Sequence, residues 1–426
     1  MIKRAAITLQ ANRQVLKNMT WLTVLQFANY LIPLLIIPYI VRVLGVEIFG
    51  KVTYAQNIIS YFTLTINFGF DYSATREIAI NKADKNARER IFWSVIKQKT
   101  ILLLLSFAGL LILHFTFSRV NDDFTLYLFI FLMNVGVVLF PTWFFQGMEE
   151  MGKMAICNVL IKGGGLILTL FLVKSSADYL AYPLLTSLAY VIFGAGAIIY
   201  VIKHYDIQYT KSDKAVDKNI FSKSLPIFLN NLFVSGYTIA NLTILGFYHS
   251  NQDIAIYGGA QKIIMAILML TSMPINIAIF PRISREFELS QVNGLRILKK
   301  TVLGVGLISI ILCIFTYVLS SLFVNILLGS EFSGSINLLK LFSVLPFLVI
   351  IASLLTVQGL YGMGLQKYAP FVGLFIGIFS IVLNIIYIPT YGTVAAALIW
   401  IAAQIIEVIL VGTILFMYSK KLCHED

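Results

Sequence analysis

The chain has 426 residues, of which 59% are hydrophobic and only 12% are charged, and its formal net charge is +12. Soluble domains carry about 25% charged residues, so this composition excludes a soluble globular protein and indicates one that crosses a membrane many times. The positive charge is explained by where Lys and Arg fall around the apolar runs, and no nucleic-acid partner is expected.

Apolar runs of about 20 residues are predicted to be membrane-spanning helices, because lipid offers the peptide groups no other hydrogen-bond partner. Twelve such runs follow one another along the chain, at residues 18–41, 52–70, 94–117, 124–145, 154–173, 179–201, 221–247, 254–280, 301–328, 337–360, 369–388 and 393–417. The first run is too long for the core of a cleaved signal peptide, so we expect it to be retained as a helix.

Lys and Arg are distributed unevenly between the two sides of these runs. One side holds 25 of the 32, in the N-terminal segment, 71–100, 146–153, 202–223, 281–300, 361–368 and the C-terminal segment. The other side holds four, and three more lie inside the runs. The positive-inside rule therefore predicts that both termini lie in the cytoplasm. An even number of spans agrees with this, because it puts both termini on the same side.

Two short sequences are written twice. Residues 146–152 read QGMEEMG and residues 358–364 read QGLYGMG, an offset of 212; AQNII at 55–59 returns as AQKII at 260–264, an offset of 205. Both echoes map the first six runs onto the last six in order and in the same orientation, which predicts a parallel repeat. Gly152 and Gly364 are expected at positions that need unusual backbone angles.

The predicted fold class is thus an all-α polytopic membrane protein with twelve transmembrane helices in two parallel six-helix repeats. The predicted domains are an N-terminal six-helix bundle at 1–201, a charged cytoplasmic linker at 202–220 and a C-terminal six-helix bundle at 221–426. The three cysteines form no CxxC pair and the four histidines are scattered, so no metal site and no cofactor are expected.

The stretch LGVEIFGKVTYAQNIISYFTLTINFGFDYSATREIA (44–79), together with PTWFFQGMEEMGKM (141–154), resembles the bacterial polysaccharide transporters. These are the O-antigen and capsule repeat-unit flippases of the multidrug/oligosaccharidyl-lipid/polysaccharide export superfamily. The topology matches over the whole chain, while the specific motifs gather in 44–154. The matching points are Leu44-Gly45, Phe49-Gly50, Phe68-Gly69-Phe70, Ala74-Thr75-Arg76-Glu77, Pro141, Trp143 and Phe145-Gln146-Gly147.

This resemblance implies a V-shaped, MATE-like arrangement of two six-helix bundles in the bacterial inner (cytoplasmic) membrane. It also implies a function: moving undecaprenyl-pyrophosphate-linked oligosaccharide, an O-antigen or capsule repeat unit, from the cytoplasmic to the periplasmic leaflet. Transport would proceed by alternating access without ATP hydrolysis. A polysaccharide polymerase and a chain-length regulator are the protein partners that the family implies, beside membrane lipid.

An anionic, sugar-bearing head group cannot cross hydrocarbon unaided, so such a transporter needs a hydrated cavity with cations for the phosphates. The candidate substrate-binding residues are Arg42, Lys51, Arg76, Lys162, Lys262 and Arg282. The alternative is that the two intramembrane lysines extend their ammonium groups to the interface, and that the arginines only mark membrane ends.

Three acidic residues are candidates for gating or ion coupling. Asp71 and Glu77 flank Arg76 and are predicted to form gate ion pairs with arginine, and Glu407 lies near the middle of the last apolar run. Glu407 is either held in a fixed ion pair with one of the intramembrane lysines or is a titratable carboxylate that couples transport to H⁺ or Na⁺.

A cation-coupled multidrug antiporter or a peptidoglycan-precursor flippase of the same superfamily is the nearest alternative, although the latter usually has two further spans. A twelve-span permease of the facilitator superfamily would carry a loop rich in Gly, Asp and Arg between spans two and three, whereas this loop reads DYSATREIAINKADKNARER. A membrane glycan polymerase or glycosyltransferase would need a substantial outer loop, whereas the outer loops here have only a few residues. With no paired carboxylates, P-loop or nucleophile motif in the sequence, the chain is not expected to be an enzyme.

Overall fold

The computed structural model describes the backbone of residues 2–211 and 213–425. Side chains are described there except at 2–19, 22, 273, 274, 276–278, 280–282 and 421–425. Within this part every secondary-structure element is a helix. The all-helical class that the continuous apolar runs predicted is therefore confirmed.

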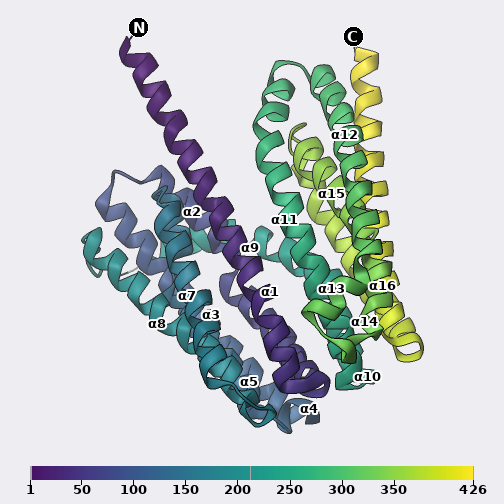
Figure 1. Cartoon of the computed structure of the whole chain (residues 1–426). Coiled ribbons are helices and arrows are strands. Elements are labelled where there is room, and N and C mark those ends of the chain that lie inside the picture. The colour runs from purple at the N-terminus through teal and green to yellow at the C-terminus, as the bar shows by residue number, and fades with distance from the viewer. Residues whose placement is uncertain (1, 212, 426) are drawn as a thin grey trace. The chain divides into compact units, whose positions relative to one another are not determined.

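The described residues of the first part of the chain, purple to teal in Figure 1, form eight α-helices and one 3₁₀-helix. These elements are α1 (Ile2–Asn67), α2 (Phe70–Ile80), α3 (Lys85–Thr116), α4 (Ser118–Asn121), α5 (Phe124–Leu139), α6 (Thr142–Gly147), α7 (Met151–Leu172), η1 (Ser176–Leu180) and α8 (Ala181–His204).

In the second part, teal to yellow, residues 213–425 form eight α-helices, the 3₁₀-helices η2 and η4, and the π-helix η3. These elements are α9 (Lys214–Thr238), α10 (Ala240–Tyr248), α11 (Asn251–Leu289), α12 (Gln291–Val318), α13 (Ser320–Leu327), η2 (Ser330–Phe332), α14 (Gly334–Phe342), α15 (Leu345–Ser353), η3 (Leu354–Leu360), η4 (Gln366–Tyr368) and α16 (Ala369–Glu425).

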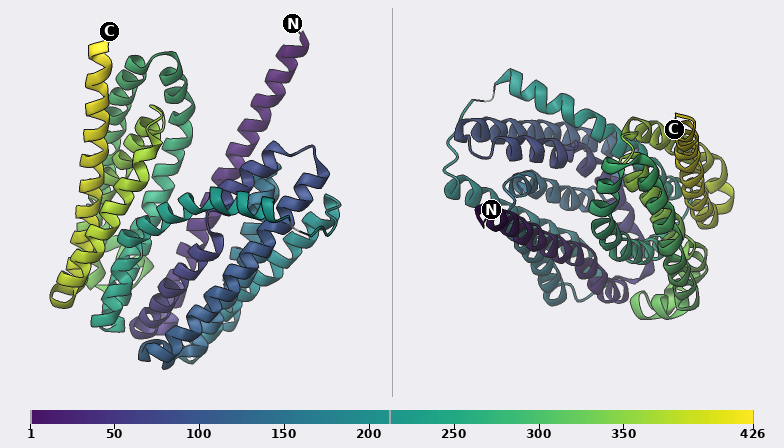
Figure 2. Two further views of the ribbon diagram at one scale, coloured as in Figure 1. Left: turned by 180° about the vertical axis from the view of Figure 1, so that it is seen from behind. Right: turned by 90° about the horizontal axis from the view of Figure 1, so that it is seen from above.

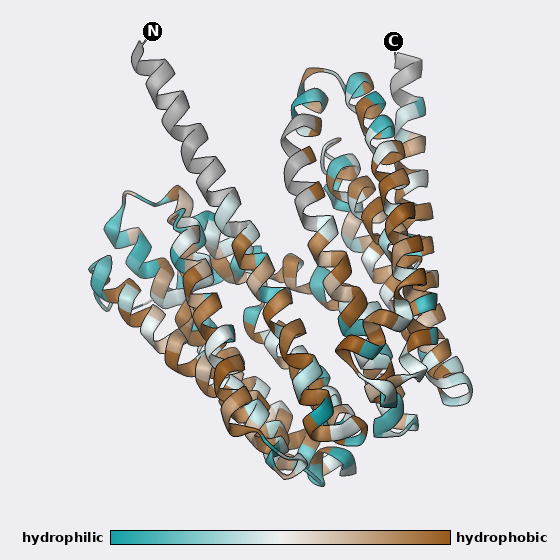
Figure 3. Ribbon diagram, in the orientation of Figure 1, coloured by the Kyte–Doolittle hydropathy of each residue, from teal (hydrophilic) through white to brown (hydrophobic). Residues whose placement is uncertain are grey.

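The described residues contain nine helices that are long and apolar enough to cross a membrane. A tenth is formed when α9 and α10, which meet at a bend of 46°, are counted as one span. Hydrophobic residues follow the length of α12 and α16, whereas hydrophilic residues gather toward helix ends and connections (Figure 3). The chain is therefore a multi-pass membrane protein, and the number of twelve spans stays a prediction.

Packing divides the chain into two compact units. The N unit comprises the chain up to Ile36 together with Ala55–Phe228, and the C unit comprises Ile37–Tyr54 and the chain from Leu229. The first helix thus contributes to both units. The predicted repeat boundaries at 201 and 221 stay a prediction, since they concern the sequence repeat rather than packing.

Glycines break the two longest helices. The backbone at Gly45 in α1 (φ 73°, ψ 167°) and at Gly392 in α16 (φ 57°, ψ −132°) leaves the helical region, and L side chains rarely adopt such a positive φ. After the first break the chain packs closely in the C unit, because a Cβ on Gly50 would lie 1.8 Å from the carbonyl oxygen of Asn251. The same asparagine donates a hydrogen bond of 2.8 Å to Glu47.

The repeated Gln-Gly loops are packing sites as well as turns. A Cβ on Gly147 would lie 2.6 Å from Cβ of Ile78 in α2, and a Cβ on Gly359 would lie 2.6 Å from a side-chain carbon of Leu415 in α16. The expectation for Gly364 is confirmed, with φ of 72°. The expectation for Gly152 is wrong: the positive φ of the first loop belongs to Glu149, at 61°, because the turn closes before α7 begins.

In the C unit, α11 and α12 run side by side (Figures 1 and 2). The two helices meet at Ser290. Ser290 ends α11, and its hydroxyl accepts a hydrogen bond from the backbone N–H of Asn293 in the first turn of α12. A serine in this position satisfies a backbone donor that the start of a helix leaves free. The local sequence therefore sets where this helical hairpin turns.

In the N unit, α5 and α8 approach each other at two glycines. A Cβ on Gly136 would lie 2.4 Å from the backbone of Tyr190, and a Cβ on Gly194 would lie 2.7 Å from the carbonyl oxygen of Gly136. Small residues allow such close helix packing in membranes, where burial of apolar surface supplies little driving force.

Substituting Gly194 by alanine is expected to lower the melting temperature of the detergent-solubilised protein, because the new methyl group would force the α5–α8 contact apart. Overpacking of this kind costs about 1–3 kcal/mol. Gly196→Ala is the matched control on the same helix, since a Cβ there meets nothing within 4 Å. Equal melting temperatures for the two variants would contradict this account of the α5–α8 contact.

The N-terminal part of α9 is held against the N unit by polar contacts. Lys223 forms an ion pair of 2.7 Å with Glu77 in α2, and Asp217 forms one of 2.8 Å with Lys97 in α3. Just before α9, the backbone N–H of Gln208 donates to Glu89 at 2.9 Å. The segment that connects the two halves of the sequence is therefore anchored along much of its length.

Candidate functional site

The N unit encloses a cavity of about 170 Å³, called the N-unit pocket. Its walls come from α1, α5, α7 and α8, and they combine apolar side chains with hydroxyl, amide and ammonium groups. The lining residues are Ile32, Pro33, Ile36, Gln56, Met133, Ile161, Lys162, Gly165, Leu166, Tyr182, Thr186 and Tyr190. The pocket can therefore offer both apolar faces and hydrogen-bonding groups to a ligand.

Lys162 supplies the only charged side chain of the N-unit pocket lining within the part of the chain whose side chains are described. Its ammonium group donates a hydrogen bond of 3.2 Å to the carbonyl oxygen of Asn29 in α1. None of the ion pairs among the described side chains involves Lys162. Gly165, one turn further along α7, lies close to the backbone of Thr186 in α8 and brings the two walls together. A charged side chain inside a membrane helix has a high free-energy cost, and it is retained where a partner or a hydrated cavity offsets that cost.

The three charged residues of α2 take different partners. The carboxylate of Asp71 accepts a hydrogen bond of 2.7 Å from the hydroxyl of Thr142, and Glu77 pairs with Lys223. Arg76 is exposed and makes none of the described hydrogen bonds or ion pairs. The acidic neighbours of Arg76 in the sequence are thus engaged by other residues, and its guanidinium group remains available to an anion.

Lys99 is a buried cation that the sequence analysis placed in a cytoplasmic loop. Its side chain is almost completely buried in the N unit, with 1% of its surface exposed, and it donates a hydrogen bond of 3.1 Å to Asn67. Asp71 is the acidic group whose charge acts on it. The available signal was that Lys99 lies inside the apolar run at 94–117, although it also ends a cluster of basic residues.

The C unit encloses a larger cavity of about 450 Å³, called the C-unit cavity. Its walls come from α9, α11, α15 with η3, and α16. Most of the lining is apolar, and the lining residues are Tyr237, Thr238, Met265, Leu268, Met269, Ser272, Val349, Ala352, Ser353, Thr356, Val357, Trp400, Gln404 and Glu407. A π-helix, rare in proteins and frequent at functional sites, forms part of this wall.

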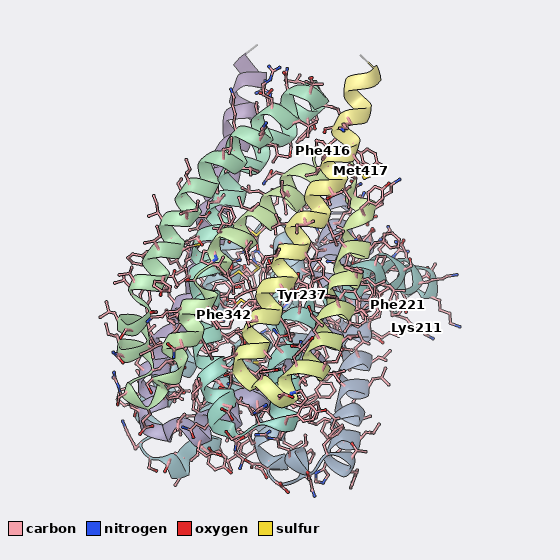
Figure 4. All side chains as sticks on the ribbon, turned by 90° about the vertical axis from the view of Figure 1, so that its right-hand side faces the viewer. Lys211, Phe221, Tyr237, Phe342, Phe416 and Met417 are labelled. Atoms are coloured by element: carbon pink, nitrogen blue, oxygen red, sulfur yellow. The ribbon has the colours of Figure 1, made fainter. Side chains whose placement is uncertain are left out.

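Among the described side chains, Glu407 is the single charged group in the lining of the C-unit cavity. It accepts a hydrogen bond of 3.2 Å from the side-chain amide of Gln404, one turn before it in α16. Tyr237, which is 7% exposed, lines the same cavity from behind α16 (Figure 4). None of the described ion pairs includes Glu407. The fixed ion pair with lysine, one of the two sequence-based interpretations, is therefore absent from the described residues.

The outer surface of α16 is of a different kind. Phe416 and Met417, both 60% exposed, project outward from this helix (Figure 4). Large apolar side chains with that exposure suit contact with acyl chains. The same helix thus presents apolar residues on its outside and Gln404 and Glu407 to the C-unit cavity.

The remaining cations lie in the C unit with the second segment of α1. Lys262 of α11 donates a hydrogen bond of 3.3 Å to the hydroxyl of Thr53, and its ammonium nitrogen lies 4.6 Å from the ring centroid of Phe49. Arg42 donates to the carbonyl oxygen of Ile326 at 3.1 Å. No described ion pair includes Lys262, so a lysine inside an apolar helix again lacks an acidic partner there.

The predicted cations are thus divided between the units. Arg76 and Lys162 belong to the N unit, while Arg42, Lys51 and Lys262 belong to the C unit. The side chain of Arg282 lies outside the described residues. Among the described side chains, no group of three His, Cys, Asp or Glu is arranged to hold a metal ion.

The folds of known transport proteins match this architecture over nearly the whole chain. One is a structure described as the inward-facing conformation of a multidrug resistance MATE family transporter of the MOP superfamily, with a TM-score of 0.67 and 15% identity; 95% of this chain and 99% of that chain are covered. Another is the lipid II flippase MurJ in an inward closed conformation, with a TM-score of 0.70 and 15% identity, covering 95% and 87%. The chain thus has the fold of the MATE and MurJ membrane transporters.

The sequence comparisons define the group more narrowly. The model of the family described as "Polysaccharide biosynthesis protein" matches residues 15–287, and the chain belongs to this family. A protein of Escherichia coli (strain K12), whose name describes it as an O-antigen transporter, is 26% identical over 407 residues, 95% of this chain and 97% of that protein. A protein of Shigella dysenteriae with the same name is 30% identical over 360 residues, 82% and 87% of the two chains. The family resemblance inferred from residues 44–154 is therefore confirmed.

Proposed function

We propose that this protein is a flippase that moves an undecaprenyl-pyrophosphate-linked oligosaccharide, an O-antigen or capsule repeat unit, from the cytoplasmic to the periplasmic leaflet by alternating access. The observation that carries the proposal is the pair of intramembrane lysines, Lys162 and Lys262, neither of which has an acidic partner among the described residues. An anionic ligand would offset the cost of holding these charges inside the membrane. The named O-antigen transporters and the MurJ-like fold support the same class of substrate.

The candidate residues would have different roles in transport. The phosphates would be held by Arg42, Lys51, Arg76 and Arg282 near the membrane ends, together with Lys262 inside α11, because cations form strong charge-assisted hydrogen bonds with phosphate oxygens. Lys162 would act within the N-unit pocket. Asp71 and Glu77 would gate the path from the cytoplasm.

Glu407 would couple transport to H⁺ or Na⁺ from the C-unit cavity. A carboxylate that has no basic partner among the described residues and lines a cavity can exchange a proton or a monovalent cation as the cavity changes its access. Polysaccharide polymerase and chain-length regulator remain the proposed protein partners, with membrane lipid around the spans.

Twelve spans in two parallel six-helix repeats, arranged as a V, are proposed for the topology. The helices α1 and α16 have 66 and 57 residues, so each is more than about 80 Å long at 1.5 Å per residue. A bilayer core is about 30 Å thick. Each helix broken at a glycine can therefore supply two spans, which together with the bent α9–α10 pair gives twelve.

This topology places both termini in the cytoplasm of the bacterial inner membrane. Single cysteines introduced at His204 and Lys174 test it in intact cells, in a background without the native cysteines. A membrane-impermeant maleimide is expected to label Lys174→Cys and to spare His204→Cys until the membrane is opened. The reverse pattern would contradict the proposed orientation.

Deletion and complementation test the function itself. A strain without the gene is expected to lose its surface polysaccharide and to accumulate lipid-linked repeat units on the cytoplasmic side, and the wild-type gene should reverse both changes. Lys262→Met should reverse neither fully, whereas Lys340→Met, a lysine that lies over the ring of Tyr317 in α12, should behave as wild type. Normal surface polysaccharide in the deletion strain would overturn the proposal for that organism.

A second candidate is a cation-coupled multidrug antiporter, and the C-unit cavity is the observation that favours it. A mostly apolar cavity of about 450 Å³ with one carboxylate suits an amphipathic organic cation, and the MATE structures share the fold. The MurJ structure equally keeps a peptidoglycan-precursor flippase as an alternative. Ethidium efflux and rescue of peptidoglycan-precursor flipping distinguish both from repeat-unit transport.

A further inference from the structure

The N-unit pocket has properties that a pyrophosphate site would not need. A pyrophosphate carries at least two negative charges and is usually held by several cations or by arginine forks. The described lining of this pocket offers a single ammonium group, from Lys162, and includes no arginine. The charge of the N-unit pocket therefore matches a ligand group with one negative charge rather than the pyrophosphate of the lipid carrier.

The size and the walls of the pocket narrow the ligand further. A volume of about 170 Å³ is below the roughly 300–1,000 Å³ of pockets that enclose drug-sized ligands, and it is comparable to one six-membered sugar ring. Tyr182, Tyr190 and Pro33 present flat apolar faces suited to the C–H faces of such a ring. Gln56 and Thr186 add the neutral donors and acceptors that sugar hydroxyls need.

Lys162 is also held in a way that leaves donors available. Its ammonium group has three N–H donors, and one hydrogen bond, to the carbonyl oxygen of Asn29 at 3.2 Å, is what it makes among the described residues. This contact fixes the direction of the side chain between α1 and α7. Two donors remain for an anionic oxygen that enters the pocket.

We propose that the N-unit pocket is a subsite for one acidic monosaccharide of the transported glycan, with the carboxylate of a uronic acid bound by Lys162 and its ring lying among Tyr182, Tyr190 and Gln56. The inference rests on the proposed function as a flippase and specifies the class of glycan. Under it, the protein favours repeat units that carry a uronic acid over otherwise identical neutral ones.

The test uses the full-length protein in proteoliposomes with two fluorescent undecaprenyl-pyrophosphoryl disaccharides that differ only in the terminal sugar, glucuronate or glucose. Reduction of the outer-leaflet fluorophore by dithionite measures the rate of flipping. Wild type should flip the glucuronate lipid faster. Lys162→Met should slow the glucuronate lipid by about 10- to 100-fold, the value of one charge-assisted hydrogen bond, and change the glucose lipid less than about twofold.

Two variants complete the design. Lys162→Gln keeps a donor for the Asn29 carbonyl without the charge, so it should show the same selective loss if Lys162→Met fails to fold. Lys174→Met is the matched control, because Lys174 follows α7, is exposed and donates to the carbonyl oxygen of Leu170; it should flip both lipids at wild-type rates.

The outcomes separate the inference from the proposed function. Equal losses on both lipids would place Lys162 at the shared pyrophosphate and overturn the subsite. Unchanged rates for both uncharged variants, or faster flipping of the glucose lipid by wild type, would also overturn it, while the flippase function stands. If wild type flips neither lipid, the proposed function itself fails.

Discussion

Replacing Glu407 by glutamine is expected to make transport insensitive to an imposed H⁺ or Na⁺ gradient and to slow gradient-driven flipping by at least about tenfold. Glutamine preserves the size of the side chain and a hydrogen bond with Gln404, but it cannot carry the negative charge that binds a cation. Flipping by proteoliposomes with and without each gradient measures the effect and identifies the coupling ion.

Glu331→Gln is the control for this experiment. Glu331 lies in η2 and is exposed, so its neutralisation removes one negative charge from the same unit without changing the C-unit cavity. It should respond to both gradients as wild type does. If Glu407→Gln also responds as wild type does, the carboxylate takes no part in coupling.

Replacing Lys99 by methionine is expected to destabilise the N unit strongly. Methionine fills a similar volume, but Asn67 loses its hydrogen-bond donor and the charge of Asp71 loses the nearby cation. A hydrogen bond from a charged donor is worth about 1.5–3 kcal/mol, and here the loss falls on a buried site. Thermal unfolding in detergent, followed by intrinsic tryptophan fluorescence, should show a large fall in the melting temperature.

Lys97→Met provides the comparison. Lys97 is two residues away on α3 and pairs with Asp217, but half of its side chain is exposed, and exposed pairs contribute at most about 1 kcal/mol. The double variant Lys99→Met with Asp71→Asn should recover part of the lost stability, because it removes both charges together. Similar melting temperatures for the two single lysine variants would show that Lys99 is not a buried structural cation.

Helix positions follow from the sequence because an apolar run in a membrane can satisfy its backbone hydrogen bonds only by forming a helix. Each of the predicted runs falls mainly on helix in the structure, although the runs at 52–70, 124–145, 221–247, 301–328 and 337–360 each include a break between two helices. Helix ends are less predictable: α3 begins at Lys85, nine residues before the predicted run, since Asp84 accepts a hydrogen bond from the backbone of Ala87 and caps a polar first turn. Hydropathy alone does not register such a cap.

The sequence was enough to predict which types of residue form the candidate site, but not which residues pair with one another there. An intramembrane lysine such as Lys162 is visible in the sequence, whereas the pairing of Glu77 with Lys223 joins residues far apart in the chain and depends on how α9 lies along α2. Lys99 was misplaced because a count of cations by loop treats every basic residue near a helix end as solvated. Its burial follows from the packing of α3 beside Asn67.

The break at Gly45 has a consequence for how the protein is made. Residues 37–54 enter the membrane early in synthesis, yet their close neighbours Asn251 and Ile326 belong to the last half of the chain. Residues 37–54 therefore lack these packing partners in the membrane until α10 through α13 have been synthesised. If the chain were cut between α8 and α9, the N-terminal fragment would therefore have to supply residues 37–54 to the C unit for the two fragments to assemble. A truncated product would expose the packing surface around Gly50 to membrane quality control.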